Sequence, residues 1–307
     1  MTAASPFITV ALCTHNHADR LVRTLAGLAH VHAPTRPWEF LVIDNGCTDG
    51  TSALLAALDW RPPGVAISVI REERLGLSNA RNRALMEARG EYLIFMDDDE
   101  TPDPDWLLAY EAAMIAQEPD ALGGRIEVFF EDGGRPAWLQ DELLGFLGKL
   151  DHGPSRWLTE TSTPIFGGNC AFRRSVFERI GDFDAKLGRM GAANNGGEDV
   201  EMYRRLLSHG CRVRWVPEAV INHRIQTPKL RRGYFLDLHF RQGRMEGARK
   251  RGLGSRIPPL YLSPQVLRAY GRALFKRMKE GSAYSLRLEM NAAYFTGYML
   301  GWIKDTV

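Results

Sequence analysis

Short apolar runs alternate with longer amphipathic runs over the first 120 residues, and this alternation constrains the fold more than any other feature. The apolar runs have the length of buried strands; they are Phe7–Cys13, Glu39–Asp44, Val65–Arg71 and Tyr92–Met96. Helix-like runs follow each of them, at Ala18–Ala29, Asp49–Leu58, Leu77–Arg89 and Trp106–Ile115. Strands separated by helices in this way predict an α/β fold with a mostly parallel central sheet flanked by helices.

The pattern is less regular after residue 120. We expect strands at Arg125–Phe130, Pro164–Phe172 and Arg212–Ile221, and a helix at Asp199–Ser208. Three helical segments follow Lys229, separated by Gly252-Leu253-Gly254 and by Ile257-Pro258-Pro259. The last contains Met290–Ile303, which has no charge but is shorter than the roughly 20 residues of a membrane span. It therefore predicts a packed core helix or an interfacial helix. We place the domain boundary between residues 1–225 and 226–307.

Charge divides the chain near the same boundary. The net formal charge is only +2, but residues 229–279 contain fourteen basic and two acidic residues. Such a segment suits an anionic partner, and we expect an anionic membrane surface. The alternative is a solvated helical face that covers the edge of the sheet. No motif of a nucleic-acid reader is present, so nucleic acid is not an expected partner.

Cysteine spacing and the start of the chain bear on the compartment. The four cysteines lie far apart, which predicts neither a disulfide framework nor a zinc site and favours a reducing compartment. Strand-like sequence begins by Phe7 and leaves no room for a signal peptide. A cytoplasmic location is therefore expected.

Polar residues follow three of the predicted strands, at the edge where α/β sheets bind ligands. They are Thr14-His15-Asn16, Asp44-Asn45 and Asp97-Asp98-Asp99. Three carboxylates at one strand end repel one another, and a divalent cation with oxygen ligands would relieve that repulsion. The alternative is a solvated turn whose aspartates cap the helix at Asp103–Gln117.

Six motifs across about residues 7–223, roughly 70% of the chain, resemble in their order those of inverting glycosyltransferases of family 2. They are Val42–Thr51, Gly76–Asn82, Asp97–Asp99, Phe166–Asn169, Gly197–Asp199 with Arg205, and His223 after Val220-Ile221-Asn222. The resemblance implies a GT-A fold, which is a Rossmann-like, mostly parallel sheet flanked by helices. The helical C-terminal extension would lie outside it.

The resemblance implies a nucleotide-sugar donor, with UDP expected and GDP or dTDP left open. Asp44 would accept a hydrogen bond from uracil N3, unless it forms a plain Asx-turn. Thr14 and Asn16 would shape the loop around the base. Asp98 would lie near the ribose, and Asp97 near the ribose or the metal.

The remaining donor contacts are implied for the diphosphate and the sugar. Arg81 would approach the diphosphate, or would instead pair on the helix surface with Glu72 or Glu73. Gly168 and Asn169 would line the donor sugar.

A departing diphosphate gains negative charge, which a divalent cation stabilises. Asp99 and His223 are the expected ligands of Mn²⁺ or Mg²⁺. The alternative for His223 is a surface histidine after an edge strand.

Inversion requires a base on the face opposite the leaving group. Asp199 fits, because it starts a helix whose dipole favours a carboxylate there; the alternative is a helix cap. Glu198 is expected to contact the acceptor or the neighbouring loop. Trp157 is expected to contact the acceptor, although core packing is the commoner role of a tryptophan. The glycine-rich run Gly188–Gly197 suggests a loop that closes on substrate.

The expected activity is metal-dependent transfer of a sugar, with inversion, to a hydroxyl of a glycan or lipid-linked acceptor. Cytosolic nucleotide sugars meet lipid-linked acceptors at the inner leaflet, so a peripheral position at that membrane face is expected. A sugar-1-phosphate nucleotidyltransferase would need a Gly-rich loop with Arg and Lys, which Cys13–His17 lacks. A non-catalytic membrane-associated scaffold would have no need of Asp99, Asp199 and His223.

Overall fold

The computed structural model describes residues 5–57, 65–131, 134–188, 197–252 and 262–303, which form two compact units. The first unit comprises Met1–Glu127 and Gly148–Arg224, and the second comprises Val128–Leu147 and Ile225–Val307. The sequence placed Val128–Leu147 with the N-terminal domain. It joins the C-terminal unit because its leucines pack there, among them Leu143, Leu144 and Leu147.

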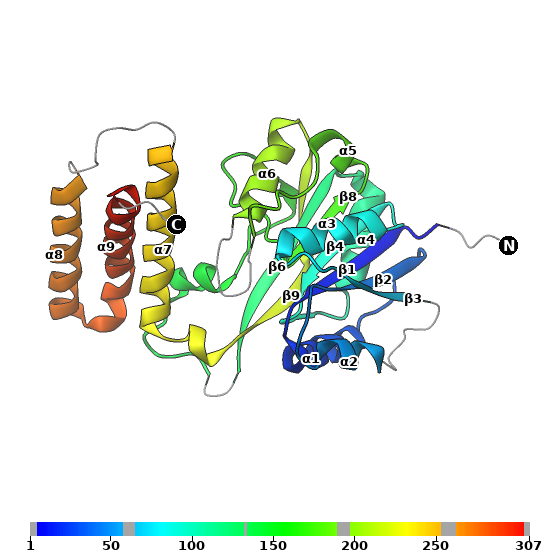
Figure 1. The fold of residues 1–307 in the computed structure, drawn as a ribbon, viewed down its shortest axis with the longest axis horizontal. Coiled ribbons are helices and arrows are strands. Elements are labelled where there is room, and N and C mark those ends of the chain that lie inside the picture. Colours follow the sequence, from blue (N-terminus) through cyan, green and yellow to red (C-terminus); the bar gives the residue numbers. More distant parts are fainter. Residues whose placement is uncertain (1–4, 58–64, 132–133, 189–196, 253–261, 304–307) are drawn as a thin grey trace. The chain divides into compact units, whose positions relative to one another are not determined.

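The first unit is built around a mixed sheet (Figure 1). Its strands are β1 (Ile8–Thr14), β2 (Trp38–Asp44), β3 (Ala66–Arg71), β4 (Tyr92–Asp97), β5 (Glu100–Pro102), β6 (Ala121–Phe130), β7 (Arg156–Trp157), β8 (Asn169–Arg173) and β9 (Val213–Ile225). Its helices are α1 (Ala18–Leu28), α2 (Thr51–Ala56), α3 (Leu77–Glu87), α4 (Trp106–Gln117), α5 (Val176–Ile180) and α6 (Glu198–Ser208). The strand order is β3-β2-β1-β4-β8-β6-β9-β5, and β7 pairs with β9.

Parallel pairing is confined to the N-terminal half of this sheet. β1 pairs in parallel with β2 and β4, and β2 with β3, as the alternating sequence predicted. β8 runs antiparallel to β4 and β6, and β5 and β7 run antiparallel to β9. The sheet is therefore less parallel than expected, because the later strands join it through long-range pairings that no local pattern indicates.

Successive side chains along each strand point to opposite faces of the sheet, so the core has one part on each face. Val10 and Leu12 of β1 pack with side chains of α1, α2 and α4. Ala11 and Cys13 of the same strand pack with side chains of α3, α5 and α6. The two helical layers lie on opposite sides of the sheet, as Figure 1 shows for α1 and α6. Burial on both faces explains why these strands read as continuous apolar runs.

Strand register brings the polar strand ends together. Thr14 pairs with Asp44, Cys13 with Asp97, and Asp44 with Arg71. The pairing of β5 with β9 places Glu100 opposite His223. These pairings therefore bring together side chains from five segments of the chain: the ends of β1, β2 and β3, the β4–β5 turn, and β9.

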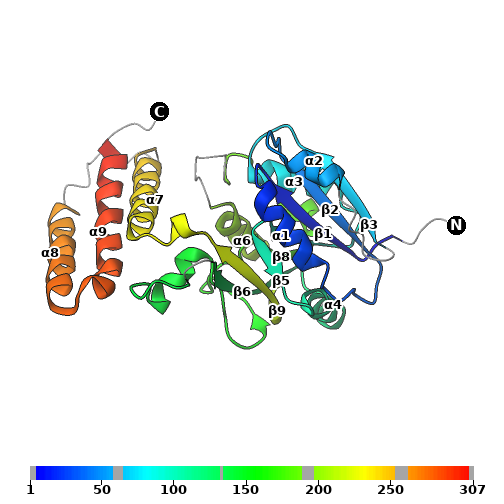
Figure 2. The same ribbon diagram turned by 90° about the horizontal axis from the view of Figure 1, so that it is seen from below.

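The second unit is a layer of three helices, α7 (Arg232–Gly252), α8 (Ser263–Glu280) and α9 (Ser282–Ile303), with the 3-10 turns η1 (Asp141–Leu147) and η2 (Thr227–Lys229). α9 lies between α7 and α8 in both views (Figures 1 and 2). Met290 of α9 is fully buried, and Trp138 packs edge-to-face on Phe235 at 5.8 Å between ring centroids. The uncharged run of α9 is thus part of a core. No helix within the described residues is long and apolar enough to cross a membrane.

Glycines allow α7 and α9 to pack backbone against backbone. A Cβ on Gly243 of α7 would lie 2.0 Å from the Tyr294 carbonyl oxygen of α9. A Cβ on Gly297 of α9 would lie 2.0 Å from the Phe240 carbonyl oxygen of α7. A backbone atom cannot turn aside as a long side chain can, so this helix pair requires glycine at both positions.

We predict that Gly243→Ala lowers the free energy of unfolding by about 2 kcal/mol, because the new methyl group forces the two helices apart. Gly271→Ala in α8 is the matched control, since a Cβ there would meet no atom within 4 Å. That control is expected to raise stability by roughly 0.5 kcal/mol through the helix propensity of alanine. Urea unfolding measures both changes, and equal midpoints for the two variants would contradict the close packing.

Candidate active site

Asp44 holds a charged carboxylate at the end of β2. The side chain is almost fully buried, and its Oδ2 accepts hydrogen bonds from Ser52 at 2.6 Å and from Arg71 at 3.0 Å. The Cys47 amide donates to Oδ1 at 2.9 Å, in a local turn of the kind considered as the alternative for this residue. Burial alone would raise the pKa of Asp44, but these donors outweigh it and lower the pKa below its ordinary value.

Two asparagines fix the loops beside Asp44. Asn16, with a left-handed φ of +54°, accepts a hydrogen bond on Oδ1 from the Thr48 amide at 2.7 Å. Asn45 accepts one from the Gly76 amide at 2.9 Å and donates to the Arg74 carbonyl at 2.8 Å. Asn16 therefore shapes the first loop, and its role toward a base stays a prediction. The sequence placed Asn45 at this edge together with Asp44 but indicated no role for it.

Thr14 and Asp98 bind each other. The Thr14 hydroxyl donates to Asp98 Oδ2 at 2.6 Å, and His17 Nδ1 lies 3.0 Å from the same oxygen. Asp98 is 6% exposed. Asp98 therefore ties the acidic turn to the first loop, and its expected place beside a ribose stays a prediction. Asp97, whose side chain is 37% exposed, is the more accessible carboxylate.

Arg81 of α3 is a fully enclosed cation, with 2% of its side chain exposed. Its Nη1 donates to Asp199 Oδ1 at 2.9 Å and to Glu198 Oε1 at 3.3 Å, while its Nη2 lies 3.7 Å from Asp97 Oδ1. Burial would lower the pKa of Arg81, but the neighbouring carboxylates reverse this and raise it. Arg81 thus joins the start of α6 to the end of β4.

This arrangement corrects both expectations for Arg81. Its guanidinium is committed to carboxylates inside the protein, so in this structure it is not presented to a diphosphate. Glu72 pairs with Arg74 at 2.9 Å, and Glu73 pairs with Arg71 at 2.8 Å, so neither glutamate is its partner. Nothing local indicated the observed partners, which lie more than a hundred residues further along the chain.

Two consecutive glycines make room for the charged cluster. A Cβ on Gly167 would lie 2.1 Å from Arg81 Nη2, and a Cβ on Gly168 would lie 2.2 Å from Glu100 Oε1. Glu100 is buried and accepts a hydrogen bond from the Asp97 amide at 3.0 Å. Burial and the nearby carboxylates raise its pKa well above the ordinary value. The sequence indicated no role for Glu100, although this residue directly follows the acidic triplet.

Asn169 is a framework residue. It is completely buried, and its Nδ2 donates to the carbonyls of Arg125 and Ala219, each at 2.9 Å. Its Oδ1 accepts hydrogen bonds from the Trp106 indole at 2.9 Å and the Tyr110 hydroxyl at 2.8 Å. Both amide hydrogens and both oxygen lone pairs are satisfied by the protein. The prediction that Asn169 contacts the donor sugar is therefore revised: it ties β8 to β6, β9 and α4.

Asp99 and His223 meet through the pairing of β5 with β9. His223 Nε2 lies 3.5 Å from Asp99 Oδ2, and each side chain is more than four-fifths buried. Gly148, at φ +98°, leaves space for the ring, since a Cβ there would lie 2.8 Å from His223 Nδ1. His223 is therefore not the surface histidine considered as its alternative.

The Asp99–His223 pair fits a divalent cation, because Mn²⁺ accepts both carboxylate oxygen and imidazole nitrogen. Within the described residues no cluster of three His, Cys, Asp or Glu side chains could hold a metal alone. This donor set therefore suits an ion that completes its coordination with substrate phosphates and water.

The predicted acceptor contacts have different surroundings. Glu198 is buried against Arg81, whereas Trp157 on β7 is 38% exposed. The guanidinium groups of Arg212 and Arg214 lie 4.8 and 5.1 Å from the Trp157 ring, so this tryptophan is not a core residue. Most of the predicted closing loop, residues 189–196, lies outside the described residues.

Comparisons of this chain with known protein families and with related proteins agree with one another. Residues 9–181, more than half of the chain, match the family model of glycosyl transferase family 2, and residues 158–229 match the N-terminal domain of galactosyltransferase. Glycosyltransferase AglE of Haloferax volcanii is 26% identical over 244 residues, which are 80% of this chain and 74% of that protein. The succinoglycan biosynthesis protein ExoM of Rhizobium meliloti is 24% identical over 242 residues, covering 78% and 74%.

A solved structure is similar in fold. The mannosyltransferase PcManGT from Pyrobaculum calidifontis, in complex with GDP-Man and Mn²⁺, aligns with a TM-score of 0.63 at 19% identity. The alignment covers 99% of this chain and 89% of that one. The predicted GT-A fold is confirmed.

Lowering the pH should reduce the free energy of unfolding, because the Asp44 carboxylate becomes protonated. Because its folded pKa is lowered, its charge stabilises the fold above the unfolded pKa of about 4, and this stabilisation disappears as the pH falls through the folded value. We predict that the stability of Asp44→Asn depends less on pH between about pH 4 and pH 2 than that of the wild type. Urea unfolding over a pH series measures this, with the exposed Asp105→Asn as control. Parallel curves for wild type and Asp44→Asn would refute it.

Proposed function

The chain belongs to glycosyl transferase family 2 and is a glycosyltransferase, and we propose that it transfers a sugar, with inversion, from a nucleotide-diphosphate donor to an acceptor hydroxyl. The acceptor is a glycan or a lipid-linked sugar. Its similarity to glycosyltransferases leaves the nucleotidyltransferase and scaffold alternatives without support.

One observation carries this proposal: a single buried guanidinium connects the start of α6 to the acidic end of β4. Arg81 binds Asp199 at 2.9 Å and lies 3.7 Å from Asp97. A base for the acceptor and a carboxylate for the donor therefore lie next to the same guanidinium. This arrangement suits inversion, because the acceptor and the leaving group lie on opposite faces of the same sugar ring.

Asp199 acts as the general base. Its side chain is 25% exposed, so one face of the carboxylate is open while Arg81 orients the other. The acceptor hydroxyl gives its proton to Asp199 as its oxygen forms a bond to the anomeric carbon. The bond from that carbon to the diphosphate breaks, and its electron pair moves to the β-phosphate oxygen. Glu198, whose Oε1 also accepts a bond from Arg81, keeps the guanidinium in place.

Asp99 and His223 would hold Mn²⁺ or Mg²⁺. When bound, the ion supplies positive charge that stabilises the departing diphosphate. The support is the chemistry of the donor pair, and PcManGT, the structural neighbour, was solved with Mn²⁺.

The donor is proposed to be a UDP-sugar. Asp44, a charged acceptor at the end of β2, would receive the uracil N3 hydrogen, and the accessible Asp97 would bind the ribose. Gly168 would line the sugar, and the exposed Trp157 would contact the acceptor. PcManGT contains GDP-Man, so GDP-sugars belong in the same test as UDP-sugars. Nucleotide sugars are cytosolic, and we place the reaction there.

Asp199→Asn should lower kcat at least about a thousandfold, because the acceptor proton loses its base. The Kd of the nucleotide donor should stay close to the wild-type value, since an amide can still accept a hydrogen bond from Arg81. The kcat is measured by nucleotide release with Mn²⁺ and a panel of UDP- and GDP-sugars. The Kd is measured by calorimetry with the same nucleotides. Glu178→Gln, an exposed position on α5, is the control. Turnover by Asp199→Asn near the wild-type rate would remove Asp199 from the mechanism.

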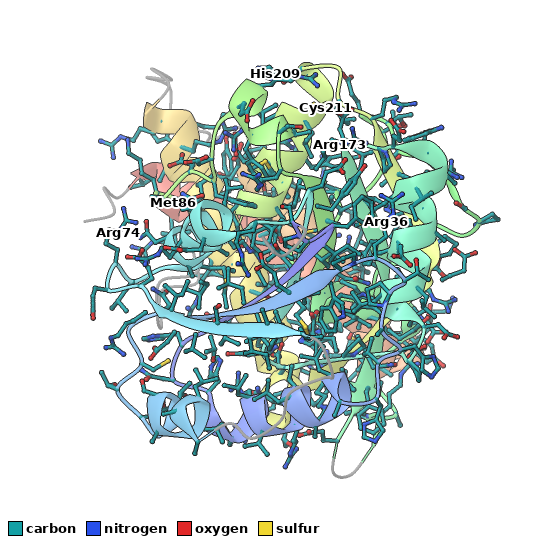
Figure 3. All side chains as sticks on the ribbon, turned by 90° about the vertical axis from the view of Figure 1, so that its right-hand side faces the viewer. Arg36, Arg74, Met86, Arg173, His209 and Cys211 are labelled. Atoms are coloured by element: carbon teal, nitrogen blue, oxygen red, sulfur yellow. The ribbon has the colours of Figure 1, made fainter. Side chains whose placement is uncertain are left out.

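His223→Ala should raise the Mn²⁺ concentration for half-maximal activity at least about tenfold, because one of two protein ligands is lost. Mn²⁺ binding in the presence of nucleoside diphosphate, followed by electron paramagnetic resonance, should weaken to the same degree. His209→Ala is the matched control, since this exposed histidine at the end of α6 (labelled in Figure 3) lies on the helix C-cap. Unchanged Mn²⁺ binding by His223→Ala would exclude the proposed ligand.

A further inference from the structure

α8 exposes an unusual amount of apolar surface for a helix in a packed unit. Five large side chains stand out from it, with exposed fractions from 49% to 79%. They are Leu267, Tyr270, Leu274, Phe275 and Met278. Their spacing of three, four and seven residues puts them on one side of the helix over about three turns. An apolar stripe of this length is a docking surface rather than scattered surface hydrophobicity.

The opposite side of α8 accounts for its packing. Ala269 and Ala273 are its buried residues, and both views show α8 lying alongside α9 only (Figures 1 and 2). These small side chains let α8 lie close to α9, while Leu267, Leu274 and Met278 face away from it. Tyr270, at the edge of the stripe, reaches α9, because its hydroxyl lies 3.1 Å from Thr296 Oγ1. Leu267, Leu274 and Met278 are instead 60% to 79% exposed.

Positive charge accompanies the stripe. α8 contains five basic residues and one acidic residue, a formal charge of +4. Only Lys276 pairs with that acid, Glu280, at 3.7 Å. In α7, by contrast, basic side chains have acidic partners at 2.7 to 2.9 Å; the pairs are Arg232–Glu289, Arg241–Asp237 and Arg249–Glu246. The formal charge of α7 is also +4, from six basic and two acidic residues, so within the described residues α8 carries a comparable share of the positive charge with fewer ion pairs.

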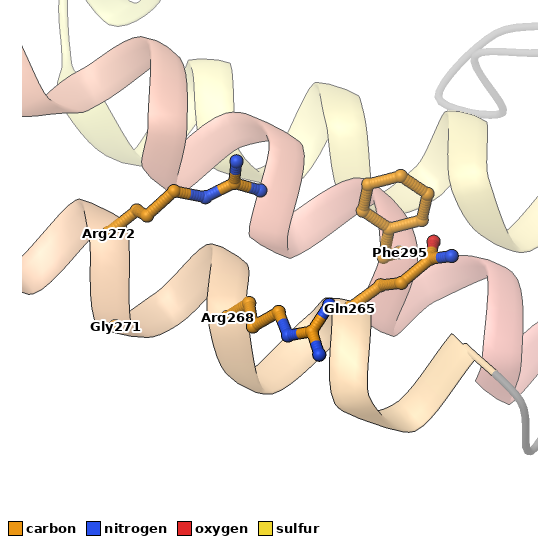
Figure 4. A pocket seen from close by; sticks show the side chains of 5 residues that line it. All are labelled: Gln265, Arg268, Gly271, Arg272 and Phe295. Atoms are coloured by element: carbon orange, nitrogen blue, oxygen red, sulfur yellow. The ribbon is translucent and has the colours of Figure 1, made fainter.

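A groove beside the stripe presents two of these cations. Gln265, Arg268 and Arg272 of α8 line it together with Phe295 of α9, and its volume is about 430 Å³ (Figure 4). The two arginines are one helical turn apart and point to the same side of α8 (Figure 4). Guanidinium groups in such a pair bind phosphate oxygens through charge-assisted hydrogen bonds.

We propose that α8 lies flat on an anionic lipid surface, with Leu267, Leu274 and Met278 among the acyl chains and Arg268 and Arg272 on lipid phosphates. An apolar stripe bordered by cations is the pattern of an interfacial helix. Charge selects the lipid over a second copy of this chain, because two faces of +4 would repel each other. The inference goes beyond sugar transfer and does not depend on it.

Vesicle flotation tests the inference with the full-length chain. The wild type should float with vesicles of equal parts phosphatidylcholine and phosphatidylglycerol, remain unbound with phosphatidylcholine alone, and be released by salt. The triple variant Leu267→Ser, Leu274→Ser, Met278→Ser should need at least about tenfold more anionic lipid for half-maximal binding. Arg268→Gln with Arg272→Gln should also need about tenfold more.

Met86→Ser is the matched control. Met86 on α3 (Figure 3) is 73% exposed, as is Leu267, but lies in the other unit, so its substitution should leave flotation unchanged. Hydrolysis of the nucleotide-sugar donor by each variant distinguishes the lipid-binding proposal from the proposed sugar transfer. Loss of lipid binding should leave the rate of donor hydrolysis unchanged. Equal binding to both vesicle types, or wild-type binding by the triple variant, would overturn the inference. A dimer seen by light scattering, lost in the triple variant without any vesicle binding, would assign the stripe to a second copy and also overturn it.

Discussion

The charge of Arg81 is the constraint on which the active site depends. A guanidinium that is 2% exposed is costly to bury unless several acceptors compensate it, and Asp199, Glu198 and Asp97 do so from two different elements. The rings of Phe95 and Phe183, each within 6 Å of its carbon, enclose it further. Gly167 leaves the space that its Nη2 occupies. The proposed base, the acidic end of β4 and Gly167 are therefore parts of one electrostatic unit, and a change in any of them disturbs the surroundings of a buried charge.

Asp99 and His223 depend on a different constraint, the short strand β5. It has only three residues, yet its pairing with β9 places Glu100 opposite His223 and brings the preceding Asp99 within 3.5 Å of that ring. Gly148 and Gly168 leave space for His223 and Glu100. The proposed metal-binding pair therefore forms only when β5 has paired with β9. Folding of β9 and formation of the proposed metal site are thus coupled.

In the C-terminal unit, the structure shows which basic residues lie beside an exposed apolar surface. The sequence distributes fourteen basic residues over 229–279, and that count alone does not say which of them face a partner. Ion pairs neutralise several on α7, while α8 keeps its charge beside an exposed apolar stripe. α7 packs closely on one side of α9 through Gly243 and Gly297, and α8 lies on the other side of α9.

The sequence by itself determined the alternating strands and helices, the carboxyl edge with Asp44 and Asp97, and the candidate base Asp199. Each of these follows from periodicity or from a motif within a few residues, which are properties of a local stretch of chain. Only the tertiary structure decided that Asp98 binds Thr14, that Asn169 is buried with its amide fully hydrogen-bonded, and that Arg81 binds Asp199. Those outcomes are set by partners 44 to 118 residues away, whose approach depends on the register of the sheet and on the space left by missing side chains. A local sequence pattern gives no information about the register of the sheet or about that space.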